Sequence, residues 1–178
     1  MHDLMAHEQR ITVLQGEHAI SRDPLVVLTT ILGSCVAACI HDPVRRIGGM
    51  NHFLLATPGA LHSVLRKDAE RYGAFAMELL INALIKRGSR RSDLRAHVYG
   101  GANLHAGMAD IGSANGQLAI EFLERDGIAI SRVDLGGQHA RRVDFRAASG
   151  QARCRVTGIC EIITPAAKQS PAGDVELF

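Results

Sequence analysis

The stretch LVVLTTILGSCVAACIH, residues 25–41, contains two extended segments separated by a Gly-Ser pair. Residues 25–32 are apolar and rich in β-branched side chains, which is typical of a buried strand. The Gly-Ser pair interrupts this pattern, and residues 35–41 resume it as a second strand. An Asp-Pro pair then marks a turn. After this turn, residues 50–55 are expected to return as a strand beside residues 35–41.

Outside this stretch, helical and strand patterns alternate along the chain. Apolar residues at steps of three and four predict a helix over 72–86 that ends at Gly88, and a second helix from about Ser113 or Asn115 to Arg125. Residues 56–70 are expected to form a loop. Short apolar or alternating runs predict further strands at 11–14, 94–99, 128–133, 141–146 and 152–156. This order predicts an α+β domain with helices packed on a mixed sheet.

The composition is that of one globular domain. The chain has 178 residues, of which 47% are hydrophobic and 21% charged. We expect the domain to span residues 11–163, with flexible ends at 1–10 and 164–178. The formal net charge is only +2, whereas nucleic-acid-binding domains are typically strongly basic. No apolar run approaches the ~20 residues of a membrane span, so we expect a cytoplasmic protein without membrane insertion.

Four cysteines and nine histidines raise the question of a disulfide or a metal site. In a reducing compartment, Cys35, Cys39, Cys154 and Cys160 are expected to remain free thiols. Their spacings match no common zinc pattern, and the histidines form neither HxH nor HExxH. We therefore expect no metal and no cofactor.

Cys35 and His52 form the pair best suited to catalysis. A cysteine acts as a nucleophile when a nearby imidazole takes its proton and later returns it to a leaving amine. A turn near residues 43–44 places the two residues opposite each other on neighbouring strands, and a register slip of two keeps them on one face. The backbone N–H groups around Gly33 and Ser34 can point at a developing oxyanion.

Thr29 precedes Cys35 by six residues and offers a hydroxyl that can orient the imidazole. Another interpretation stays open at this point. A cysteine in an apolar strand is usually a small buried side chain, and a histidine near a turn is usually only hydrogen-bonded. Residue spacing alone does not decide between the two interpretations.

Longer motifs resemble one protein family. Residues 29–37, TTILGSCVA, and residues 48–55, GGMNHFLL, contain the candidate cysteine and histidine. In the family's order they are followed by Arg71-Tyr72-Gly73, Ala76-Met77-Glu78, Leu80-Ile81-Asn82, Tyr99-Gly100-Gly101-Ala102, Ile111-Gly112-Ser113-Ala114-Asn115, Asp134-Leu135-Gly136-Gly137, Arg141-Arg142-Val143 and Ser149-Gly150. Over about residues 12–157, the chain resembles the CheD family, the chemoreceptor glutamine deamidases.

The resemblance implies a fold and a role for each site residue. The implied fold is a three-layer α/β/β sandwich similar to the deamidase domain of cytotoxic necrotizing toxins. Cys35 matches the nucleophile, and His52 matches the general base. Thr29 matches the hydroxyl that orients the histidine, although the adjacent Thr30 leaves that assignment open. After Leu55 the chain departs from the family's more direct Leu-Pro, which affects the loop beside the site rather than catalysis.

The implied activity is that of a protein-glutamine glutaminase. It would hydrolyse specific glutamine side chains to glutamate on methyl-accepting chemotaxis receptors, with no cofactor. The resemblance also implies a CheC-type phosphatase as a partner. Two alternatives stay open: a non-catalytic adaptor that binds receptors or such a phosphatase, and an acyl transferase that passes the same thioester to an amine.

Overall fold

The computed structural model describes residues 7–54, 63–104 and 109–157. Within these ranges the chain forms nine strands, two α-helices and one short 3₁₀ helix. In chain order they are β1 (Gln9–Thr12), β2 (His18–Ser21), β3 (Val26–Leu32), β4 (Val36–Asp42), β5 (Ile47–Asn51), α1 (Ser63–Lys86), η1 (Arg91–Asp93), β6 (Arg95–Gly100), α2 (Ala109–Arg125), β7 (Ala129–Leu135), β8 (Arg141–Arg146) and β9 (Gln151–Val156).

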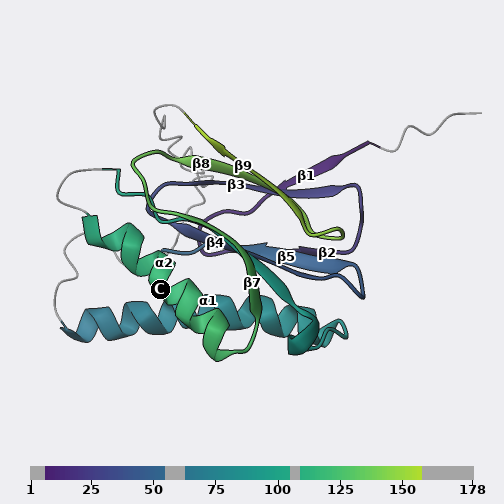
Figure 1. The fold of residues 1–178 in the computed structure, drawn as a ribbon, viewed down its shortest axis with the longest axis horizontal. Helices are drawn as coiled ribbons and strands as arrows, with labels where there is room; N and C mark the ends of the chain where they lie inside the picture. Colours follow the sequence, from purple (N-terminus) through teal and green to yellow (C-terminus); the bar gives the residue numbers. More distant parts are fainter. Residues whose placement is uncertain (1–6, 55–62, 105–108, 158–178) are drawn as a thin grey trace, which may run out of the picture.

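The strands form two sheets stacked face to face (Figure 1). The four-stranded sheet has the order β1-β3-β8-β9, and the five-stranded sheet has the order β2-β5-β4-β6-β7. Both sheets are mixed, because β1 runs parallel to β3 and β6 runs parallel to β7 while the other pairs are antiparallel. Helices α1 and α2 pack on the five-stranded sheet, on the face turned away from the four-stranded sheet (Figure 1). The domain therefore has three layers.

The central strand β4 is buried on both faces. Val36, Ala38 and Ile40 lie in the core between the five-stranded sheet and the helices. Ala37 and Cys39 lie in the second core, between the two sheets. A strand covered on both sides needs no polar face, which is why the sequence shows a continuous apolar run here rather than alternation. Cys35 directly precedes this buried strand, which begins at Val36.

The structure confirms the α+β class and the packing of two helices on a mixed sheet. It corrects the expected loop at 56–70, because α1 begins at Ser63. Residues 63–71 are rich in Arg, Lys, Glu and Ala, which favour helix even where no apolar period is present. The rest of that expected loop lies outside the described residues. Strand β2, which the sequence did not indicate, is a four-residue edge strand paired with β5.

The folded part of the chain begins before the expected start at residue 11. Strand β1 starts at Gln9, whose N–H donates to the Leu25 carbonyl at 2.9 Å, so residues 9 and 10 belong to the sheet rather than to a flexible end. Residues 1–6 and 158–178 lie outside the described residues. The expected boundary at 163 and the flexible ends therefore stay predictions.

Three of the four cysteines, Cys35, Cys39 and Cys154, are free thiols as expected. Cys160 lies outside the described residues. In the described ranges, neither helix is long and apolar enough to cross a membrane.

Candidate active site

Cys35 lies in a short loop between β3 and β4, and the connection between β6 and α2 fixes that loop. Gly101 N–H donates to the Cys35 carbonyl and Ala102 N–H to the Gly33 carbonyl, both at 2.8 Å. Asn115 Nδ2 donates to the Ser34 carbonyl at 2.8 Å. The carbonyl groups of Gly33, Ser34 and Cys35 therefore each accept a hydrogen bond from the segment that follows β6 or from α2. Asn115, which the sequence suggests as a possible helix start, lies inside α2 and holds this loop instead.

The same loop leaves backbone donors available. The N–H groups of Gly33 and Ser34 make no hydrogen bond within the described part of the chain. The N–H of Cys35 hydrogen-bonds to its own sulfur, which opposes the rise that burial causes in the pKa of the thiol. Unbonded N–H groups beside a nucleophile are the donors that an oxyanion needs. An oxyanion role for Gly33 and Ser34 stays a prediction.

Glycine is required where the chain passes behind Cys35. Gly100 has a φ of +113°, which side-chain-bearing residues rarely adopt. A Cβ built on Gly100 would lie 2.2 Å from the Cys35 carbonyl oxygen. The Gly-Gly-Ala motif at 100–102 therefore serves the close approach of two backbones within the chain.

His52 follows β5 and shares a face with Cys35. Val36 and Phe53 pair across the two strands, which places His52 opposite Ala37 rather than opposite Cys35. The expected register is therefore off by two residues. Because side chains alternate along a strand, this difference leaves both residues on the face toward the four-stranded sheet, as diagonal neighbours.

The hydrogen bonds of the His52 ring fix its tautomer. Thr30 Oγ1 lies 2.9 Å from Nδ1 of His52, and the same hydroxyl donates to the Val13 carbonyl at 2.8 Å. Since the hydroxyl proton goes to Val13, the Thr30 oxygen accepts a proton from Nδ1. Nε2 then carries the lone pair. It is buried and has no hydrogen-bond partner in the described part of the chain, so it is free to accept a proton.

The expectation that Thr29 orients His52 is wrong. Thr29 Oγ1 donates to Asp144 Oδ1 at 2.8 Å, on the outer face of the four-stranded sheet. Adjacent residues of a strand point to opposite faces, so only Thr30 points into the space between the sheets. Burial raises the pKa of Asp144, but hydrogen bonds and charges from Thr29, Arg10 and Arg155 outweigh it and leave the pKa below its ordinary value.

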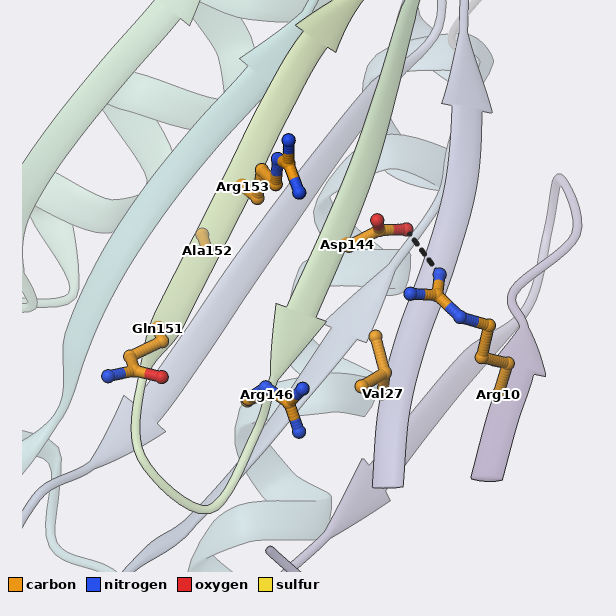
Figure 2. A pocket seen from close by; sticks show the side chains of 7 residues that line it. All are labelled: Arg10, Val27, Asp144, Arg146, Gln151, Ala152 and Arg153. Atoms are coloured by element: carbon orange, nitrogen blue, oxygen red, sulfur yellow. Dashed lines mark hydrogen bonds and ion pairs between the residues drawn. The ribbon is translucent and has the colours of Figure 1, made fainter. Parts of the chain in front are cut away.

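Asp144 also borders a cavity of about 390 Å³ on that outer face. Figure 2 shows its carboxylate turned toward the guanidinium of Arg10, with which it forms an ion pair at 3.0 Å. The cavity is lined by Arg10, Val27, Asp144, Arg146, Gln151, Ala152 and Arg153. Cys35 and His52 are not among these residues. The cavity is therefore separate from the thiol site.

Burial keeps both candidate catalytic groups uncharged at neutral pH. It raises the pKa of the Cys35 thiol to about 11. It lowers the pKa of His52 below its ordinary value, although the contact of His52 Nδ1 with the Val13 carbonyl, at 3.3 Å, acts in the opposite direction. The resting pair is a neutral thiol beside a neutral imidazole.

Four residues of the site received no role, or only an alternative one, from the sequence: Thr30 was the open alternative to Thr29, and Asn115 was considered only as a helix start. Thr30, Val13, Asn115 and Gln15 all contact the loop or the ring described above. An alternation of polar and apolar residues along the strand could have favoured Thr30 over Thr29. The other residues of this strand are apolar on both of its faces, so no such alternation is present. Val13, Gln15 and Asn115 come from segments distant along the chain, and nothing in the sequence relates them to the Cys35 loop.

Comparison with known proteins identifies the family of this chain. The family model described as "CheD chemotactic sensory transduction" matches residues 54–156. A protein of a Caulobacter species named "Probable chemoreceptor glutamine deamidase CheD" is 48% identical over 95% of this chain and 93% of its own length. The chain belongs to the CheD family. A protein of the same name from Zymomonas mobilis is 51% identical over 83% of this chain and 80% of its own length. Another, from Caulobacter vibrioides, is 46% identical over 99% of this chain and 97% of its own length.

Solved structures give weaker likenesses. A hypothetical protein YfiH of Bacillus licheniformis has a TM-score of 0.40 and 16% identity, over 74% of this chain and 60% of that one. YlmD from Geobacillus stearothermophilus has a TM-score of 0.36 and 12% identity, over 72% of this chain and 61% of that one. The expected likeness to the deamidase domain of cytotoxic necrotizing toxins stays a prediction.

Proposed function

We propose that this CheD protein hydrolyses glutamine side chains of methyl-accepting chemotaxis receptors to glutamate. The names of its relatives state this activity for them. The observation that carries the proposal is the His52 ring, whose buried Nε2 has its lone pair free on the face that also bears the Cys35 thiol. A thiol and a fixed neutral imidazole are what amide hydrolysis by a cysteine needs.

In the proposed reaction, Cys35 Sγ attacks the carboxamide carbon of the substrate while His52 Nε2 takes the thiol proton. The resulting oxyanion lies near the N–H groups of Gly33 and Ser34, which have no other acceptor in the described residues. His52 then gives its proton to the departing nitrogen, and ammonia leaves. A water molecule, deprotonated by His52, cleaves the thioester and yields glutamate with the thiol restored.

Thr30 takes the positioning role in this proposal. Its oxygen accepts the Nδ1 proton of His52 while its own proton is held by the Val13 carbonyl. This arrangement leaves the ring one orientation, with Nε2 as the base. The catalytic set is therefore Cys35 and His52, positioned by Thr30.

We expect Thr30→Ala to lower the deamidation rate more than Thr29→Ala. Loss of the bond to the ring removes about 0.5–1.5 kcal/mol, or roughly 2- to 10-fold in rate, before any misalignment. Thr29→Ala is expected instead to lower the melting temperature, because its hydroxyl serves buried Asp144. Ammonia release and thermal unfolding of both variants measure this, with Thr30→Ser as a control that keeps the hydroxyl. A larger rate loss in Thr29→Ala would contradict the assignment.

The proposed function is tested by ammonia release from a glutamine-containing fragment of a chemoreceptor. We expect release from the fragment and none from free glutamine, because the sequence offers no evident charged clamp near Cys35 for an amino acid's own charges. The assay is repeated with a primary amine. Release without conversion to glutamate, accompanied by incorporation of the amine, would identify an acyl transferase. Binding without release would identify an adaptor.

The CheC-type phosphatase and the cytoplasmic location are further parts of the proposal. Both rest on the resemblance described above and on membership of a chemotaxis family. Co-purification of the full chain with such a phosphatase tests the partner. We propose that neither reaction step requires a cofactor.

A further inference from the structure

A glutamine of the chain itself lies at the candidate nucleophile. Cys35 Sγ donates to the side-chain oxygen of Gln15 at 3.5 Å. Gln15 is exposed, and it reaches the thiol from the turn between β1 and β2. A carboxamide therefore occupies the space in front of Cys35 that a substrate carboxamide has to enter.

Gln15 is held there by a turn bonded to the backbone of His52. Glu17 N–H donates to the Leu14 carbonyl at 3.0 Å, and Gly16 has a φ of +87°, as a type II turn requires at its third residue. Gly16 N–H donates to the His52 carbonyl at 2.7 Å, and His52 N–H donates to the Glu17 carbonyl at 3.0 Å. Backbone hydrogen bonds therefore connect the turn that carries Gln15 directly to His52.

We propose that Gln15 is a catalytic residue whose side-chain amide donates to the oxyanion formed at Cys35, a role that rests on the proposed function. In the tetrahedral intermediate, the oxyanion lies one bond beyond the carbon attached to Sγ. It therefore develops within reach of a group that already contacts the sulfur. A carboxamide carries both an acceptor and a donor, and rotation about its terminal bond exchanges them. The Gln15 N–H then complements the backbone donors of Gly33 and Ser34.

The resting contact fits the same role. With no substrate bound, the Cys35 proton is held by the Gln15 oxygen, and Nε2 of His52 has no partner in the described residues. When a substrate carboxamide enters, the Gln15 amide turns its nitrogen toward the substrate oxygen and releases the thiol proton to His52. One side chain thus stabilises the neutral thiol before attack and the negative oxygen after it.

A purely structural role for the Gln15 side chain is disfavoured by its exposure. Its turn is held by backbone hydrogen bonds of Leu14, Gly16 and Glu17, none of which involve the Gln15 side chain. Truncation of the side chain therefore leaves these bonds intact. The effect of a substitution should be seen in the reaction rather than in stability.

We expect Gln15→Ala to lower kcat about 10²- to 10³-fold, the range for loss of one oxyanion donor, with KM changed little. Gln15→Glu should lose more, because a carboxylate repels the oxyanion and cannot donate. Leu14→Ala is the matched control, since Leu14 is 58% exposed on the same turn. Steady-state ammonia release from the receptor fragment gives kcat and KM. The melting temperature of each variant should stay at that of the wild type.

Three results would overturn the proposal. A lower KM with unchanged kcat in Gln15→Ala would make Gln15 an internal competitor. Conversion of Gln15 to glutamate in the wild type but not in Cys35→Ala, found by peptide mass mapping, would make it an internal substrate. Unchanged kinetics in Gln15→Ala and Gln15→Glu would make it a bystander. Failure of the proposed function itself is distinguishable, because the wild-type protein would then release no ammonia.

Discussion

Cys35→Ala is expected to abolish ammonia release from a glutamine-containing receptor fragment. The change removes the atom that forms the thioester, and loss of a covalent nucleophile costs on the order of 10⁶-fold in kcat. The fold should persist, because Cys35 is only half-buried and the substitution removes a single sulfur atom. The ammonia assay measures the loss, and thermal unfolding verifies the fold.

Cys154→Ala is the matched control for this variant, since Cys154 is also a half-buried free thiol but lies on β9, outside the site. It should retain activity. Cys39 provides a second comparison. It is fully buried, and burial raises the pKa of its thiol, so an alkylating reagent should modify Cys35 well before Cys39. Ammonia release by Cys35→Ala at the wild-type rate would refute the nucleophile assignment.

His52→Ala is expected to lower kcat by at least about 10²-fold, the lower end of what general acid–base catalysis supplies. His52 is the diagonal neighbour of Cys35 across the two strands, and in the proposed reaction its ring returns the proton to the leaving nitrogen. The loss should exceed that of Thr30→Ala, which removes only the orientation of the ring. Ammonia release from the same receptor fragment compares the two variants.

The pH dependence of kcat/KM tests whether His52 acts as a base or has only a structural role. Protonated His52 cannot accept the thiol proton, and burial lowers its pKa, so kcat/KM of the wild type should fall as the pH drops from about 6.5 through this lowered pKa. No alkaline fall is expected below the thiol pKa of about 11. In His52→Ala the acid limb should disappear from the residual activity. An unchanged acid limb would assign it to another group.

The same lowered pKa affects stability with a definite sign. In the unfolded chain, the imidazole binds a proton below about 6.5, while the buried ring binds it only at lower pH. The free energy of unfolding should therefore decrease as the pH falls below about 6.5. Thermal unfolding of the wild type over this range corrects the activity profile for any loss of folded protein.

The placement of Cys35 and His52 on one face of the sheet could be predicted from the sequence, because it depends only on whether the register error is an even number of residues. A register error of two residues moves His52 along the neighbouring strand without changing its face. The choice between Thr29 and Thr30 could not be predicted in this way. Strand β3 is buried on both faces apart from Ile31, so its sequence lacks the polar alternation that would assign each threonine to a side.

The supporting residues could not be predicted for a different reason. Gln15 and Asn115 reach the Cys35 loop from segments that are separated from it by 20 and 81 positions along the chain. Nothing in their local sequence specifies that approach, since it follows from how the two sheets and α2 pack together. The start of α1 at Ser63 was missed because residues 63–71 are rich in charged residues, which occur both in loops and in helices.

Strand β3, which carries Thr30, lies between β1 and β8, two strands from opposite ends of the described chain. A growing chain releases Cys35 and His52 from the ribosome well before Arg141–Arg146 can pair with β3. Pairing between segments so distant in sequence is also intrinsically slow. An incomplete chain therefore exposes a cysteine and a histidine without the partner layer that fixes the imidazole. We therefore expect amide hydrolysis only from a chain in which β8 has already paired with β3.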